Sequence, residues 1–396
     1  MLTIWESFWL NEFGAVESHA RSDLHFARFD CEITKIRFRG LAKVPILLLG
    51  DDSPQMRQAV SPFIAGTPSA SLGIILCLTA GAHEFVLTAS SLPAARFLVL
   101  SPDDVESLVR HALPVERLRH FLLVQIPHHR LIPYSISEPT EGAMFVGREV
   151  ELQMLMYEDQ DFALCGPGGV GKTSLLRQKQ WLLRRQRDPR AKSIVEVDLL
   201  TCPLNLDHAA RAIAWEVSPS KRASDMTVKG LGEFLKRISR SDPRFEDGPI
   251  DLIIDEADEI LSLDRRTHEG EHVYPLMRQL RFARLHGAIR LTISGRAETA
   301  RLLNDPNNPF ALGREGDQGH GVQSRFKLLE IGPLNEIQAR ELLFRPLNDL
   351  GYPVDANQQV LKQKLGACGG IPIQVQSLGL DLANEAARHR LFNVAS

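Results

Sequence analysis

The stretch from residue 143 to residue 332 alternates short apolar runs with longer segments of mixed polarity. The apolar runs predict strands at Asp161–Cys165, Ser193–Asp198, Ile250–Asp255, Ile289–Ser294 and Phe326–Ile331. The segments between them predict helices at Lys172–Arg187, Leu206–Val217, Val228–Ser239 and Tyr274–Leu285. The run at Ile250–Asp255 is almost continuously apolar, which is typical of a strand at the centre of a parallel sheet. This alternation predicts a doubly wound α/β domain.

The first 132 residues show a shorter version of the same pattern. Buried strands are predicted at Val44–Asp52, Ser71–Gly81 and Arg96–Ser101, and Ser53–Phe63 can form a crossover helix. After the third strand, Ser101 is suited to cap a helix, because Pro102 fits the first helical position and two aspartates follow in the first turn. We expect a small α/β domain with a parallel sheet here.

The remaining segments complete the domain plan. Pro, Ser and Gly are frequent from Pro133 to Gly142, which predicts a linker, and the polar, glycine-rich stretch Asn304–Gly321 predicts a long loop. The last part of the chain is helical in pattern, and Asn335 with Gln338 predicts a capping box. We therefore expect an N-terminal domain at 1–132, a linker at 133–142, a core at 143–332 and a helical segment at 333–396.

A glycine-rich sequence follows the first core strand. The pattern G-x-x-x-x-G-K-T spans Gly166–Thr173 between a predicted strand and a predicted helix, which is the context that a P-loop requires. Its glycines allow backbone N–H groups to surround a polyphosphate, and the helix adds the positive end of its dipole. Lys172 is expected to reach the β- and γ-phosphates and Thr173 to ligate Mg²⁺, so the predicted cofactors are ATP and Mg²⁺. The residues expected to bind the nucleotide are Gly166, Pro167, Gly168, Gly169, Val170, Gly171, Lys172, Thr173 and Ser174.

An acidic pair ends the third core strand. Asp255 is placed to hold Mg²⁺ through water, and Glu256 is placed to polarise the attacking water. An acidic pair can also cap the following helix, but the P-loop upstream favours the catalytic interpretation.

Composition limits the other classes of function. The chain has 396 residues and a formal net charge of −3, which gives no global electrostatic argument for nucleic acid or membrane. The five cysteines are scattered and form no C-x-x-C pair, so neither a disulfide framework nor a zinc site is predicted. The start of the chain lacks the pattern of a signal peptide, and no apolar run is long enough to span a membrane. We expect a cytoplasmic protein with no membrane association.

The core motifs, taken in order, resemble the AAA+/STAND class of P-loop ATPases. The resemblance covers about residues 143–390 and is greatest to bacterial ATPases related to origin-recognition initiators and to NB-ARC switch proteins. The sequence FVGRE, Phe145–Glu149, is similar to the box on the adenine side of the family's site. The resemblance implies that Val146, Gly147 and Arg148 line the base.

Two further motifs belong to the same resemblance. LTISGR, Leu291–Arg296, lies where the family keeps sensor 1, which implies Ser294 as the polar sensor and Arg296 as an arginine aimed at the γ-phosphate. GGIPIQ, Gly369–Gln374, resembles the G-x-P motif of the family's helical lid, which implies that residues 333–396 form this lid and that Pro372 packs near the nucleotide. Arg296 can also be a solvated residue at a strand end, and the glycine pair an ordinary helix C-cap. The predicted catalytic set is Glu256, Lys172, Ser294 and Arg296.

The sequence departs from the family pattern after the lid. Family members usually continue into a winged helix and a repeat-built sensor, so we expect sensing by the N-terminal domain or by a separate protein. That domain contains no E-x-K or D-x-K triplet before the linker, which argues against a nuclease and favours an adaptor or a degenerate effector.

Two basic stretches, Arg177–Lys192 and Arg278–Arg290, allow contact with nucleic acid, but a solvated helix face or a subunit interface is the favoured interpretation. In that case Arg281 and Arg284 are candidates for arginine fingers that act on a neighbouring subunit.

These observations favour an ATP-dependent switch with slow or partner-stimulated hydrolysis. We expect a homo-oligomer, a protein partner for the N-terminal domain and, by resemblance, a role in bacterial defence or stress signalling. The alternative is a DNA-binding AAA+ regulator or loader of the transposition or replication type. A third hypothesis is a scaffold that binds ATP without hydrolysing it.

Overall fold

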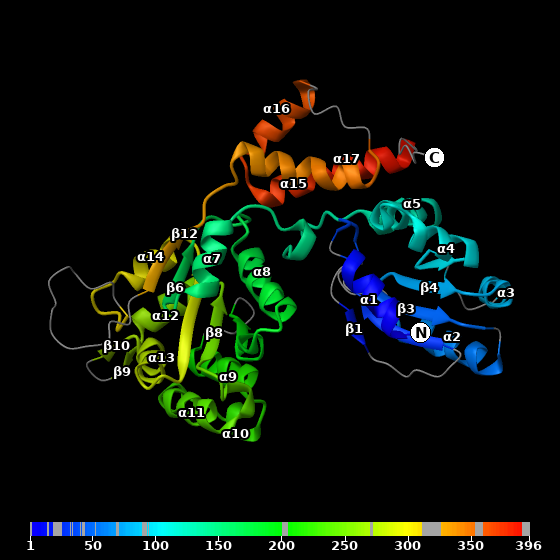
Figure 1. The fold of residues 1–396 in the computed structure, drawn as a ribbon. Helices are drawn as coiled ribbons and strands as arrows, with labels where there is room; N and C mark the ends of the chain where they lie inside the picture. The colour runs from blue at the N-terminus through cyan, green and yellow to red at the C-terminus, as the bar shows by residue number, and fades with distance from the viewer. Residues whose placement is uncertain are drawn as a thin grey trace. The chain divides into compact units, whose positions relative to one another are not determined.

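The chain packs into two compact units that do not follow its linear order. The first unit contains Met1–Glu138, Gly142–Val146 and Asn335–Ser396, and the second contains Pro139–Glu141 and Gly147–Leu334. The structure is a computed structural model, and it describes residues 2–13, 16–18, 26–31, 33, 35–39, 41, 44–51, 53–68, 71–88, 93, 95–199, 205–269, 272–310, 326–352 and 359–389. Figure 1 labels most of the helices and strands of each unit.

A five-stranded parallel sheet forms the centre of the second unit. Its strand order is β12-β6-β11-β8-β7. The strands are β6 (Asp161–Cys165), β7 (Ile194–Asp198), β8 (Ile250–Asp255), β11 (Ile289–Gly295) and β12 (Phe326–Glu330). All five core strands predicted from the apolar runs are present, with ends within one residue of the prediction. All six residues of β8 are buried, as expected for an inner strand.

Helices precede and connect the strands of this sheet, and α9 to α14 share a hydrophobic core with it. They are α7 (Glu149–Tyr157), α8 (Lys172–Arg185), α9 (Leu206–Val217), α10 (Lys221–Ser224), α11 (Val228–Ser241), α12 (Asp258–Arg266), α13 (Pro275–Leu285) and α14 (Ala297–Leu303). A short antiparallel hairpin, β9 (His268–Glu269) and β10 (His272–Val273), precedes α13. The predicted P-loop α/β fold is confirmed. The predicted loop at 304–321 lies outside the described residues from 311 onward.

The sheet of the first unit is mixed, which corrects the prediction of a parallel sheet. It is formed by β1 (Val16–Ser18), β2 (Phe26–Cys31), β3 (Val44–Leu49), β4 (Gly73–Cys77) and β5 (Phe97–Leu100), in that order. The three strands predicted from apolar runs pair in parallel, but β1 and β2 add an antiparallel edge. An antiparallel neighbour needs no crossover helix, so β2 can pair with β3 without one.

The helices of this unit come from both ends of the chain. They are α1 (Leu2–Glu12), α2 (Pro54–Gly66), α3 (Ala80–Thr88), α4 (Pro102–Arg110), α5 (Pro114–Gln125), α6 (His128–Leu131), α15 (Glu336–Asp349), α16 (Gln359–Ala367) and α17 (Pro372–His389). Ser101 caps α4 as predicted, and Asn335 with Gln338 forms the predicted capping box of α15. The apolar run at 71–81 is not one strand, because β4 ends at Cys77 and α3 begins at Ala80.

Specific contacts join the N-terminal domain to the C-terminal helices within the first unit. Tyr134 is buried, its hydroxyl donates to the carbonyl oxygen of Leu343, and its ring lies where a Cβ on Gly379 would come within 2.5 Å. Arg119 donates to the carbonyl oxygen of Asp349 at 3.1 Å, and the Arg37 backbone N–H donates to the Asp349 carboxylate at 3.3 Å. These arginines place positive charge at the C-terminus of α15, where the helix dipole favours it.

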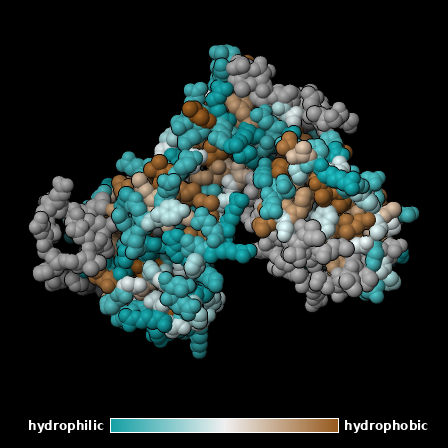
Figure 2. All heavy atoms as spheres, viewed as in Figure 1, coloured by the Kyte–Doolittle hydropathy of each residue, from teal (hydrophilic) through white to brown (hydrophobic). Residues whose placement is uncertain are grey.

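No helix in the described part of the chain has the length and apolar character needed to cross a membrane. On the face drawn in Figure 2, hydrophilic residues interrupt the hydrophobic ones over both units.

One buried carboxyl group holds α12 against the start of α13. Asp264 is fully buried and accepts the backbone N–H groups of Leu276 at 2.7 Å and Met277 at 3.0 Å. Burial raises the pKa of Asp264 to about 7, although the two hydrogen bonds and the charge of Arg278 act in the opposite direction.

This raised pKa predicts a pH-dependent stability. Between about pH 4 and about pH 7 the folded chain keeps a proton on Asp264 that the unfolded chain releases, so this group's stabilising contribution decreases as the pH rises. Urea unfolding over this range should give a shallower pH dependence for Asp264→Asn than for the wild type. Asp225→Asn, at an exposed position, is the control. Equal pH dependence in the wild type and Asp264→Asn would contradict the prediction.

Candidate nucleotide site

The glycine-rich loop lies at the carboxyl edge of the central sheet, between β6 and α8. Ligands bind in this position in open parallel sheets. Gly169 and Gly171 have φ values of 76° and 93°, a backbone region that residues with a Cβ rarely adopt. A Cβ on Gly166 would lie 2.1 Å from the carbonyl oxygen of Ile331, so only glycine fits there. The loop therefore has the shape that the G-x-x-x-x-G-K-T pattern predicts.

The side chain of Lys172 folds back onto the glycine-rich loop. Its Nζ donates to the carbonyl oxygens of Gly166 and Pro167, each at 3.0 Å, and the residue is 5% exposed. Within the described part of the chain no carboxylate pairs with this ammonium group. A buried positive charge balanced only by carbonyl oxygens is suited to a polyphosphate.

One hydrogen bond connects the loop to the acidic pair after β8. Thr173 Oγ1 donates to Asp255 Oδ2 at 2.7 Å, and the second oxygen of Asp255 accepts the Glu256 N–H at 3.0 Å. Asp255 is 4% exposed. Hydroxyl and carboxylate oxygens are the ligands that Mg²⁺ prefers, so the donor set fits this metal.

Glu256 occupies a strained position at the same edge. Its φ is 50°, which is unfavourable for a residue other than glycine, and such strain is concentrated at functional sites. Burial raises the pKa of Glu256, and the neighbouring charge of Asp255 raises it further, while Lys172 and Arg296 act in the opposite direction. A carboxylate with a raised pKa is a better proton acceptor from water.

The end of β11 brings the two predicted sensor residues to this edge. Ser294 is fully buried, and its Oγ has no hydrogen-bond partner in the described part of the chain. Buried hydroxyl groups are normally bonded, so this one is unusual. Arg296 is exposed and precedes α14, and its charge reaches Glu256.

The residues predicted to line the base are divided between the units. Gly147 and Arg148 have left-handed backbones with φ values of 74° and 67°, and they precede α7. The Arg148 guanidinium donates to the carbonyl oxygen of Gly332 and pairs with Glu151 at 3.7 Å. Val146 and Pro372 belong to the first unit, where Pro372 begins α17. Their predicted contacts with the nucleotide stay predictions.

Arg284 is not available as an arginine finger, which corrects the prediction. Its Nε donates to both carboxylate oxygens of Asp161, at 3.0 and 2.8 Å. Asp161 is the first residue of β6, so it lies about 13 Å along the strand from Cys165, which precedes the loop. Arg281 is partly buried on the same helix. Arg284 therefore stabilises the opposite edge of the sheet.

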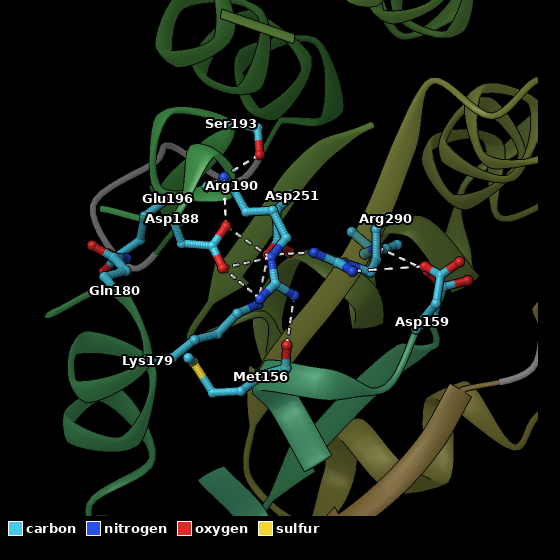
Figure 3. A network of polar contacts seen from close by, with 12 residues as sticks. Met156, Asp159, Lys179, Gln180, Asp188, Arg190, Ser193, Glu196, Asp251 and Arg290 are labelled. Atoms are coloured by element: carbon cyan, nitrogen blue, oxygen red, sulfur yellow. Dashed lines mark hydrogen bonds and ion pairs between the residues drawn. The ribbon is translucent and has the colours of Figure 1, made fainter. Parts of the chain in front are cut away.

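A network of buried charges lies at that opposite edge (Figure 3). Lys179 Nζ donates to Asp251 Oδ2 at 2.6 Å, with side-chain exposures of 2% and 0%. Arg290 donates to the same oxygen at 3.1 Å. Burial alone would raise the pKa of Asp251, but the charges of Lys179 and Arg290 outweigh it and lower this pKa. The network fixes α8, β8 and β11 to one another.

Sequence reasoning missed two sets of residues that shape the site. Lys179 and Asp251 were overlooked, although a lysine in a buried stretch of α8 and an aspartate inside an apolar strand are each unusual. Asp258, two residues after Glu256, was also overlooked. Its carboxylate accepts the Arg296 N–H, a contact between segments far apart in the sequence.

Comparison with known proteins found similar chains among the solved structures alone. No protein-family model matches the chain, and no curated protein matches it. Solved structures similar to it include the Orc1 protein of Aeropyrum pernix in complex with DNA, at 18% identity and a TM-score of 0.44 over 64% of this chain and 63% of that one. Another is a signal transduction ATPase with numerous domains (STAND) and a tetratricopeptide repeat sensor from Pyrococcus horikoshii, at 12% identity and a TM-score of 0.35 over 63% of this chain and 33% of that one. This chain thus spans less than two thirds of the length of either.

The buried network generates a stability prediction. Lys179→Met leaves Asp251 with one cationic partner in a fully buried position, so the free energy of unfolding should fall by about 3–5 kcal/mol. The control is Arg184→Met on the exposed face of the same helix, with an expected change within about 0.5 kcal/mol. Urea unfolding measures both, and equal effects of the two variants would contradict the prediction.

Proposed function

We propose that this protein is an ATPase that binds ATP with Mg²⁺ at the glycine-rich loop and uses hydrolysis to reset a conformational switch. The hydrogen bond between Thr173 and Asp255 carries the proposal, because it brings a P-loop hydroxyl and a carboxylate together beside Glu256. Few other chemistries need a glycine cradle, a buried lysine and an acidic pair at one sheet edge.

Each residue has a separate part in the proposed reaction. The loop N–H groups and Lys172 bind the phosphates, and Thr173 and Asp255 would hold Mg²⁺, which supplies positive charge to the phosphate oxygens when bound. Glu256 accepts a proton from water as the water oxygen attacks the γ-phosphorus and ADP leaves. Ser294 and Arg296 contact the γ-phosphate and so distinguish ATP from ADP.

The packing of the first unit suggests how the nucleotide state reaches the rest of the chain. The C-terminal helices and the N-terminal domain share that unit through Tyr134, Arg37 and Arg119, so we expect them to move as one body. The linker residue Thr140 donates to Ser174 Oγ from its N–H at 3.1 Å, directly beside Thr173. A nucleotide bound at Thr173 can therefore alter the segment that leads into the first unit.

The output of the switch is proposed to be assembly into a homo-oligomer or recognition of a protein partner by the N-terminal domain. We propose bacterial defence or stress signalling as its setting, and the resemblance of the motifs to those of switch ATPases supports this proposal.

A DNA-binding regulator is the second candidate function. The observation that favours it is a group of exposed arginines at the end of α8, Arg184, Arg185 and Arg187, with Arg185 stacked on Trp181 at 5.1 Å. Such a group can neutralise phosphates. Salt-dependent binding of duplex DNA that is lost on neutralising these three arginines would support this function.

The catalytic assignment predicts a separation of binding from turnover. Glu256→Gln should bind ATP but hydrolyse it about 10²–10⁴-fold more slowly, because the proton acceptor is lost. Lys172→Ala should lose ATP binding. Glu259→Gln, the same change at an exposed position of α12, is the control and should retain turnover. Full turnover by Glu256→Gln would show that the base lies elsewhere.

Movement of the N-terminal domain and the C-terminal helices as one body predicts which distances change with the nucleotide. Spin labels at the exposed positions Arg110, Val360 and Arg222 report on the N-terminal domain, the C-terminal helices and the second unit. Exchange of ADP for ATP in Glu256→Gln should change the 110–222 distance and leave the 110–360 distance unchanged. A change in the 110–360 distance would contradict movement as one body.

A further inference from the structure

We propose that Asp258 is a positioning residue that fixes the turn between β11 and α14, and so holds Arg296 in place for contact with the γ-phosphate. This inference rests on the proposed function, because it assigns the support of the γ-phosphate contact in that same site.

The carboxylate of Asp258 joins α12 to the start of α14. The backbone N–H of Arg296 donates to Asp258 Oδ1 at 2.9 Å and to Oδ2 at 3.0 Å. Thr299 Oγ1 donates to Asp258 Oδ1 at 2.7 Å. Arg296 is the N-cap residue of α14, so Asp258 holds the start of that helix from the neighbouring helix α12.

The turn is packed directly onto this carboxylate. A Cβ on Gly295 would lie 2.0 Å from Thr299 Oγ1 and 3.0 Å from Asp258 Oδ2. Thr299 is fully buried. The backbone at 295–296 therefore has little freedom to move while these contacts are intact.

The same contacts argue that Asp258 is not the base. Its two oxygens already accept the Arg296 N–H, which is shared between them, and the Thr299 hydroxyl, and both donors stabilise a carboxylate in place. In the described part of the chain, the Glu256 side chain accepts no hydrogen bond and the Arg296 guanidinium makes no ion pair. The backbone of Arg296 is thus fixed while its charged group stays available to a ligand.

Asp258 also connects the segment that carries the proposed base to the segment that carries the proposed γ-phosphate contacts. It lies on the segment that carries Asp255 and Glu256, and it binds the segment that carries Ser294 and Arg296. A shift of one segment against the other would therefore be resisted by the Asp258 contacts, and the distance from base to arginine would be preserved.

The test compares single and double variants by ATP turnover and by the ratio of ATP to ADP affinity. Arg296→Ala should lower both quantities. Asp258→Ala should lower both to a similar extent. Turnover and affinity ratio of the double variant should lie within about twofold of those of the Arg296→Ala protein, because both changes remove the same contact with the γ-phosphate. Asp258→Asn keeps an acceptor oxygen and should restore most of the loss. A purely structural role would lower thermal stability without changing the affinity ratio.

The outcomes separate this inference from the proposed function. If Arg296→Ala lowers the ratio of ATP to ADP affinity but Asp258→Ala leaves this ratio normal, the positioning role alone is overturned. Additive losses in the double variant would overturn it as well. Absence of ATP binding or turnover in the wild type would overturn the proposed function. Should Asp258→Ala fail to fold, Thr299→Val removes one donor to the same carboxylate and should reduce the ratio in the same direction, and an unchanged ratio would count against the inference.

Discussion

The hydrogen bond from Thr173 to Asp255 is the contact on which the candidate site depends. It joins α8 to β8 at the carboxyl edge of the central sheet, where the candidate nucleotide site lies. The buried pair of Lys179 and Asp251 joins the same two elements at the other edge. Lys179 lies about 9 Å further along the helix, and Asp251 about 13 Å back along the strand. Two contacts so far apart oppose both sliding and tilting of the helix. The glycine loop, which begins the helix, therefore keeps its position over the acidic pair.

Among the described residues, buried charges are paired with one another at one edge of the central sheet, but not at the other. At the far edge every buried carboxylate described above has a cationic partner, since Asp161 binds Arg284 and Asp251 binds Lys179 and Arg290. At the nucleotide edge, Lys172 is bonded only to carbonyl oxygens, and the pKa of Glu256 is raised. Charges paired within the chain serve stability, whereas unpaired or perturbed charges are typical of functional sites. This contrast supports a ligand that brings both phosphate oxygens and a metal ion.

The sequence predicted the core well because its strands are continuous apolar runs and its loop needs glycine at fixed positions. The acidic pair after β8 followed from the same strand ends, whereas Ser294 followed from the resemblance of LTISGR to the family's sensor 1. The antiparallel edge at β1 and β2 was missed, because β1 has three residues and charged residues interrupt the apolar pattern of β2. The partner of Arg284 and the role of Asp258 depend on contacts between distant segments, which no local pattern records. The packing of α15 and α17 on the N-terminal domain was missed for the same reason.

The central claim is that Thr173 and Asp255 form the metal-dependent part of an ATP site. The measurement that tests it most directly is calorimetric titration of ATP into the wild type and Thr173→Val, each with and without Mg²⁺. The account predicts one ATP site per chain. Mg²⁺ should increase the affinity for ATP in the wild type but not in Thr173→Val. Absence of saturable binding, or the same dependence on Mg²⁺ in both proteins, would contradict it.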